Sequence, residues 1–100
     1  MITKVIINKS TENKFNKDVK NGLFSPKVRD LIEYWVTEIE DLGYSEYKKS
    51  ELFKMLKDHS LKNERQGQHS ITLDQTGGRL IYAVAKDAIV IKITSDHNYS

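Results

Sequence analysis

A change in the spacing of apolar residues restricts the fold of this chain most strongly. After Ser25 and Pro26, apolar residues recur three or four positions apart until Gly43. A capping serine followed by proline is a typical helix start, and glycine is a common stop. These signals predict one long helix with a single apolar face. The residues of that face are Val28, Leu31, Ile32, Trp35, Val36, Ile39 and Leu42.

From Gln68 onward, apolar and polar residues alternate with a period of two, which is typical of strands that bury one face. Strands are expected at 68–73, 79–84 and 89–93, with turns at 76–78 and 86–87. The last third of the chain therefore predicts a meander of three antiparallel strands.

The first half of the chain supplies a strand and two further helices around the long one. Residues 3–8 fit a strand, and Ser10 is a candidate N-cap for a short helix that Asn21 and Gly22 end. Ser45 is a candidate cap for another helix that runs to about residue 57. The prediction is a single α+β domain of residues 1–100, with helices packed on one face of a four-stranded, mostly antiparallel sheet.

Composition excludes several classes of protein. The 100 residues include 16 basic and 14 acidic side chains, so the formal net charge of +2 does not favour nucleic-acid binding by bulk electrostatics. The absence of cysteine excludes a disulfide scaffold and a thiolate nucleophile. No apolar run approaches the roughly 20 residues of a membrane span, and the N-terminus resembles a strand more than a signal peptide. We expect a cytoplasmic protein with no membrane partner.

The candidate chemistry lies in three histidines and the basic residues near them. Imidazole titrates nearest neutral pH, so such side chains suit proton transfer beside a phosphate. The combination suggests RNA cleavage without a metal or cofactor. A metal site made by the three histidines is disfavoured, because their spacings of 10 and 28 residues follow no local ligand pattern. The residues concerned are His59, His69, His97, Lys62, Arg65 and Arg79.

The same region resembles the RelE/YoeB branch of the RelE/ParE toxins of bacterial toxin–antitoxin systems. The resemblance is carried by His59-Ser60-Leu61-Lys62, Gly67, Ser70, the strand 79–84 (Arg-Leu-Ile-Tyr-Ala-Val) and His97. It implies a RelE-like fold and a ribosome-dependent endoribonuclease that cuts mRNA in the decoding site. It also implies a cognate antitoxin that silences the toxin.

The resemblance assigns roles residue by residue. His97 matches the C-terminal histidine of the family and is expected to be the general acid. Arg79 matches the third-strand arginine, whose planar guanidinium suits phosphate oxygens. Lys62 adds a second positive charge. His59 is the candidate general base, since YafQ-like relatives have histidine where YoeB-like chains have glutamate, and Glu64 is the nearest carboxylate substitute.

Base recognition is expected from aromatic stacking, which is usual for unpaired RNA. Tyr99, Tyr82 and His69 are the candidates, with Arg65 nearby. Two departures from the family pattern are Ser60 in place of proline and Asn98 in place of the terminal tyrosine. His69 shares strand parity with apolar residues, so it is either a hydrogen-bonded core residue or part of the site.

Two alternatives remain open. A non-catalytic toxin of the ParE branch would inhibit a protein target such as DNA gyrase. An unrelated small α+β binding module would leave the histidines without a role. For either toxin, the antitoxin is expected to cover the basic region 54–65 or to displace the segment that carries His97.

Overall fold

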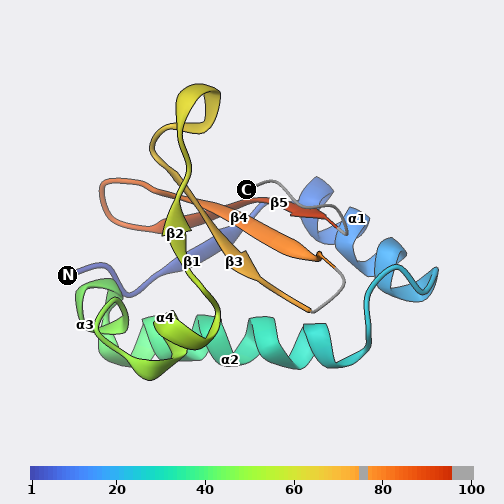
Figure 1. Ribbon diagram of the computed structural model, residues 1–100, viewed down its shortest axis with the longest axis horizontal. Coiled ribbons are helices and arrows are strands. Elements are labelled where there is room, and N and C mark those ends of the chain that lie inside the picture. The colour runs from blue at the N-terminus through green and yellow to red at the C-terminus, as the bar shows by residue number, and fades with distance from the viewer. Residues whose placement is uncertain (75–76, 96–100) are drawn as a thin grey trace.

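The computed structural model describes residues 1–74 and 77–95. It forms an α+β structure in which one sheet is flanked by helices (Figure 1). The elements are, in chain order, β1 (Val5–Ile7), α1 (Lys9–Lys20), α2 (Lys27–Leu42), α3 (Tyr44–Tyr47), α4 (Glu51–Met55), β2 (His59–Ser60), the 3-10 turn η1 (Asn63–Arg65), β3 (Gln68–Thr72), β4 (Arg79–Val84) and β5 (Ile89–Ser95).

The sheet has five strands in the order β1-β5-β4-β3-β2. Each of the strands β2, β3 and β4 pairs antiparallel with the next strand in the chain. β1 pairs parallel with β5, where Val5 lies opposite Ile89. The expected meander is therefore confirmed. A register irregularity lies in β4 between Ile81 and Tyr82, at its pairing with β5.

The long helix α2 packs along one face of this sheet and closes the core (Figure 1). Its capping agrees with the sequence, since Ser25 Oγ accepts a hydrogen bond from the Lys27 amide at 3.3 Å. The helix ends at Gly43, whose φ of +84° lies in the left-handed region that favours glycine. The buried apolar and aromatic residues of the core are Phe15, Phe24, Val28, Trp35, Ile39, Tyr44, Tyr47, Leu52, Leu56, Ile71, Leu73, Leu80, Tyr82, Ile89 and Ile91.

The structure corrects the expected helix from Ser45 to residue 57, which is divided into α3 and α4. Ser50 causes the division, because its side chain accepts from the Phe53 amide at 3.3 Å and donates to the Tyr47 carbonyl at 2.6 Å. It thereby ends one helix and caps the next. The cap of α1 is likewise Asn8, whose Oδ1 accepts from the Thr11 amide at 2.8 Å, and not Ser10.

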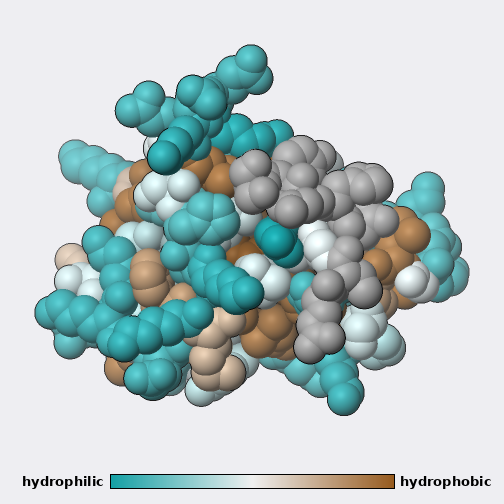
Figure 2. Space-filling view, viewed as in Figure 1, coloured by the Kyte–Doolittle hydropathy of each residue, from teal (hydrophilic) through white to brown (hydrophobic). Residues whose placement is uncertain are grey.

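The number of strands is also corrected, from four to five. The additional strand β2 has two residues, and it pairs His59 with Ser70 and Ser60 with His69. So short a strand has no periodicity that a sequence pattern reveals. The loop between β2 and β3, which carries η1, projects from the body of the molecule and presents a hydrophilic surface (Figures 1 and 2).

No helix in residues 1–74 and 77–95 is long and apolar enough to cross a membrane.

Candidate functional site

The two faces of the sheet differ in what they carry. Ile71, Leu80 and Tyr82 face the helices and belong to the core. Side chains alternate along each strand, so Ser70 and Arg79 belong to the opposite face. The pairing of His59 with Ser70 assigns His59 to that face as well, because directly paired residues share a face. The opposite face therefore brings together two of the predicted catalytic residues.

His59 is exposed on the edge strand β2, and one of its ring nitrogens is fixed by the backbone. Its Nδ1 lies 2.9 Å from the Lys57 carbonyl oxygen. A carbonyl oxygen only accepts hydrogen bonds, so Nδ1 carries the proton in this contact. In the neutral ring, Nε2 then presents its lone pair, as a general base requires.

Arg79 opens β4 and is half-buried, with its Nη1 donating to the Gly78 carbonyl at 3.0 Å. It lies opposite Thr72 on β3 and Ser95 on β5. Its Nε is buried and makes no hydrogen bond within the described residues, and the same holds for the Ser70 hydroxyl. Buried polar groups normally have partners, so these two groups on neighbouring strands are exceptions within the described part of the chain.

The sheet ladder fixes the separation of His59 and Arg79. His59 on β2 lies opposite Ser70 on β3, and Ser70 lies opposite Ile81 on β4. Arg79 is two residues before Ile81 on the same strand. With strand spacings of about 4.8 Å and a rise of about 3.4 Å per residue, the Cα atoms of His59 and Arg79 are about 12 Å apart. At that separation the His59 imidazole and the longer Arg79 side chain can reach groups on either side of one phosphodiester.

The predicted cations of the β2–β3 loop are placed differently. Lys62 precedes η1 and is exposed, while Glu64 and Arg65 lie within η1. Arg65 Nη1 donates to Gln68 Oε1 at 3.2 Å, which ties the turn to the start of β3. The loop thus presents charge near His59, at the edge of the sheet and away from Arg79.

Tyr82, predicted to stack on RNA, is instead completely buried, which corrects that expectation. Its ring packs at 5.1 Å against His69 with 17° between the planes. Its hydroxyl lies 2.9 Å from that of Tyr44 and donates to Asp58 Oδ2 at 2.7 Å. The residue therefore supports the site from beneath and is not accessible to a base.

His69 lies on the helix-facing side, as its strand parity indicated, yet it remains partly exposed. Its Nδ1 is 3.3 Å from Ser60 Oγ. Burial lowers the pKa of His69 most, and nearby Lys48 and His59 lower it further, whereas Asp58 opposes the shift. His69 is thus both a hydrogen-bonded residue at the core boundary and a wall of the cavity described below.

Asp58 is the main residue that the sequence did not reveal. Its Oδ2 accepts from the hydroxyls of Tyr47 at 2.6 Å and Tyr82 at 2.7 Å. Tyr47 in turn accepts from the Trp35 indole at 3.0 Å. Burial raises the pKa of Asp58, and the two tyrosine hydrogen bonds act in the opposite direction. Burial and the Asp58 charge raise the pKa values of Tyr47 and Tyr82, so both keep their protons.

A cavity of about 320 Å³ lies beside this network, at the edge of the sheet where β2 meets α3 and α4. No sequence pattern marks it, because its walls come from five separate elements and loops. The residues that line it are Tyr44, Lys48, Phe53, Asp58, His59, Ser60, His69 and Val84.

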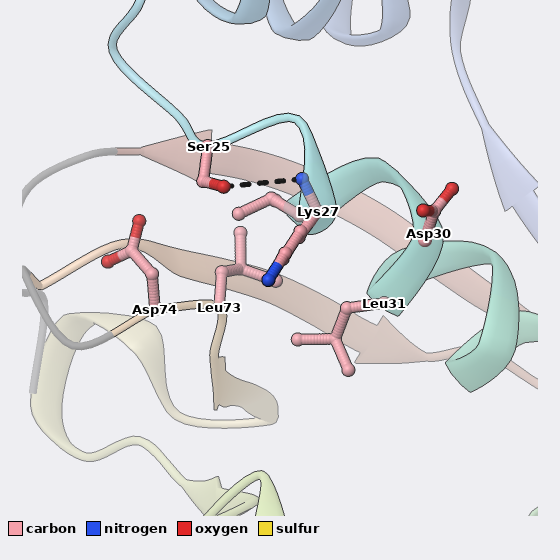
Figure 3. Close-up of a pocket in the computed structure, with 7 residues that line it drawn as sticks. Ser25, Lys27, Asp30, Leu31, Leu73 and Asp74 are labelled. Carbon is pink, nitrogen blue, oxygen red and sulfur yellow. Dashed lines mark hydrogen bonds between the residues drawn. The ribbon is translucent and has the colours of Figure 1, made fainter.

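A larger cavity of about 620 Å³ lies at the other end of α2. Figure 3 shows it between the start of that helix and the end of β3, with Leu31 and Leu73 beside Lys27 and Asp74. Neither His59 nor Arg79, the predicted catalytic residues that the structure describes, borders it.

His97 and Tyr99 lie outside the described residues. Within residues 1–74 and 77–95, no three His, Asp or Glu side chains gather in a way that would hold a metal ion.

Comparison with known proteins gives similarity at the level of structure. No protein-family model and no curated protein matches the sequence. The copper-bound form of a mutant toxin from Helicobacter pylori is similar with a TM-score of 0.65 and 22% identity, over 96% of each chain. YafQ from Escherichia coli has a TM-score of 0.67 and 14% identity, over 92% of this chain and 90% of YafQ.

A third similar structure is the YoeB–YefM complex from Staphylococcus aureus. Its TM-score is 0.65 at 17% identity, over 95% of this chain and 97% of that one. The described residues therefore have the fold of small bacterial toxins. More particularly, it is the RelE-like fold of YoeB and YafQ, so the α+β class expected from the resemblance is confirmed.

Proposed function

We propose that this chain is the toxin of a type II toxin–antitoxin system, an endoribonuclease that cleaves mRNA in the decoding site of the ribosome. The observation that carries the proposal is the fixed ring of His59. Its Nδ1 is held by the Lys57 carbonyl, and it shares a sheet face with Arg79. The toxin fold supports the same class of protein.

The residues suggest a metal-independent reaction. His59 Nε2 takes the proton of the 2′-hydroxyl, and the resulting oxyanion attacks the adjacent phosphorus. Arg79 stabilises the charge that develops on the phosphoryl oxygens. The bond to the 5′-oxygen breaks as His97 protonates it, which leaves a 2′,3′-cyclic phosphate and a 5′-hydroxyl. Glu64 is the alternative base.

Lys62 and Arg65 would hold the RNA backbone at the projecting loop, and Tyr99 would stack on a base. The formal net charge of +2 is small, so the ribosome would supply much of the binding energy for the message.

The proposal is tested by mapping mRNA ends on purified translating ribosomes. Wild-type protein should produce cuts within the decoding-site codon, and Arg79→Ala and His97→Ala should each abolish them. Arg29→Ala, an exposed arginine on α2, is the matched control and should cut normally. Growth arrest without cuts would contradict the proposal and favour a non-cleaving toxin that acts on gyrase.

The proposed partner is a small antitoxin with a segment that folds on binding, by analogy with the YoeB–YefM complex. It would cover residues 54–65 or displace the segment that carries His97. Co-expression with the product of the adjacent gene should relieve toxicity and yield a complex. Lys54→Glu and Lys57→Glu, both on that surface, should weaken the complex, whereas Lys20→Glu, at the exposed end of α1, should not.

A further inference from the structure

The cavity at the β2 edge has the composition of a binding site for a flat heteroaromatic group. Its volume of about 320 Å³ is at the small end of the range of roughly 300–1,000 Å³ that is usual for ligand pockets. Aromatic side chains from three parts of the chain line it, namely Tyr44, Phe53 and His69. A single planar ring system is the ligand that such walls accommodate.

His69 offers one ring face to a stack that already exists. The Tyr82 ring packs nearly parallel to it at 5.1 Å, so a base placed on the cavity side would extend the stack. The lowered pKa of His69 keeps the ring neutral at pH 7, which favours stacking on an uncharged base.

Asp58, a buried carboxyl group, also lines the cavity. Only 8% of the residue is exposed, and both tyrosine hydrogen bonds go to Oδ2. The other oxygen, Oδ1, accepts no hydrogen bond within the described part of the chain. A buried carboxylate oxygen without a donor is costly, so the site favours a ligand that brings an N–H group.

Lys48 adds a positive charge to the wall of the cavity. Its side chain is exposed, with Nζ 5.2 Å from the centre of the Tyr44 ring. His59 borders the same cavity, so a nucleotide held there would lie next to the proposed base. The three features suit one nucleotide. The acceptor suits an N–H group of its base, the aromatic walls suit the face of the base, and the cation suits its phosphate.

We infer that this cavity binds one nucleobase of the RNA substrate and selects bases with an exocyclic amino group, adenine, cytosine or guanine, over uracil. Asp58 Oδ1 accepts from the amino group. Uracil offers one N–H between two carbonyl oxygens, and those oxygens would face the carboxylate. The inference deepens the proposed function and rests on it for the identity of the ligand as RNA.

The test is a titration of the purified protein with AMP, CMP, GMP and UMP, in which binding is detected by changes in backbone amide chemical shifts in NMR spectra. The three amino-bearing nucleotides should bind about tenfold more tightly than UMP, the effect expected for one hydrogen bond to a charged acceptor. The shifts should include His69 and Ser60. Equal binding of all four, or no binding, would overturn the inference.

Variants make the test sharper. Asp58→Asn keeps an acceptor for the tyrosines and offers an amide donor to the cavity, so the preference should disappear or turn towards UMP. Asp41→Asn, an exposed residue at the end of α2, is the matched control and should keep the preference. Lys48→Ala, a change to an exposed side chain, should lower the affinity for all four nucleotides by a similar factor. It tests the cavity as the binding site even if Asp58→Asn fails to fold.

The source of the nucleotide is decided by adding the RNA trinucleotides AAA and UUU. Tighter binding of AAA than of AMP supports an RNA site, whereas equal affinity would overturn the RNA assignment in favour of a free nucleotide. Because these titrations use neither ribosomes nor cleavage, their failure is distinguishable from failure of the proposed reaction. If the protein cuts mRNA in the decoding site but shows no base preference in the titrations, the proposed function is supported and the role of the cavity is refuted.

Discussion

The Tyr82 hydroxyl donates a hydrogen bond to Asp58 Oδ2 at 2.7 Å, in the core between β4 and the segment that precedes β2. Asp58 directly precedes His59, so this hydrogen bond ties the position of His59 to β4. A buried carboxylate depends on such donors, because burial alone disfavours its charge. The hydrogen bond between Tyr82 and Asp58 therefore holds the start of β2 against the core.

Removal of that hydroxyl should destabilise the fold. Tyr82→Phe leaves the packing of the ring and deletes a donor to a buried charged group, so the free energy of unfolding should fall by about 1–3 kcal/mol. Urea unfolding followed by circular dichroism measures it. The control is Tyr34→Phe, since Tyr34 is 57% exposed and its variant should stay within about 0.5 kcal/mol of wild type. Equal midpoints for both variants would contradict the role of the pair.

His69 should make stability depend on pH. Its pKa is lowered from the ordinary value of 6.5, so the unfolded chain binds more protons than the folded one between the two values. The free energy of unfolding therefore rises with pH across that window and levels off above about 6.5. In His69→Gln the rise should be smaller, while the two curves should run parallel above pH 7. Identical slopes below 6.5 would refute the assignment.

The division between α3 and α4 predicts different effects for two serines of one segment. Ser50→Ala removes the cap of α4 and should cost about 1 kcal/mol. Ser45→Ala should change the free energy of unfolding by less than about 0.5 kcal/mol, because α3 has no side-chain cap. Thermal unfolding of both variants compares them directly. A larger loss in Ser45→Ala would mean that α3 and α4 form one helix.

Much of the architecture was readable from the period of the apolar residues. The stripe from Val28 to Leu42 and the alternation around Leu80 each match one secondary structure, so α2 and the meander were predicted. Strand β2 was missed because two residues carry no period. The end of α3 was missed because Ser50 reads equally well as an exposed residue inside a helix.

The candidate site was less readable. His59 and Arg79 were identified by their chemistry, and the ladder through Ser70 places them on one face. Tyr82 was misplaced, although its alternation with Leu80 already indicated burial. Asp58 was beyond prediction, because a buried aspartate is recognised only once Tyr47 and Tyr82, from distant parts of the chain, are seen to donate to it.

The fixed tautomer of His59 predicts a selective loss of activity. His59→Gln should reduce single-turnover cleavage on ribosomes by about 10²–10⁴-fold, the usual contribution of a general base. The melting temperature should hardly change, because the side chain is exposed. Gln66→Ala, at an exposed position of the loop that follows β2, provides the comparison and should cleave normally. Undiminished cleavage by His59→Gln would transfer the role of base to Glu64.

The parallel pairing of β1 with β5 determines when the sheet can be completed during synthesis. Val5 to Ile7 find their partners only in Ile89 to Ile91, more than eighty positions later. Contacts so distant in sequence form late, since a long loop must close before they are made. A nascent chain therefore carries an open sheet until its last strand has emerged.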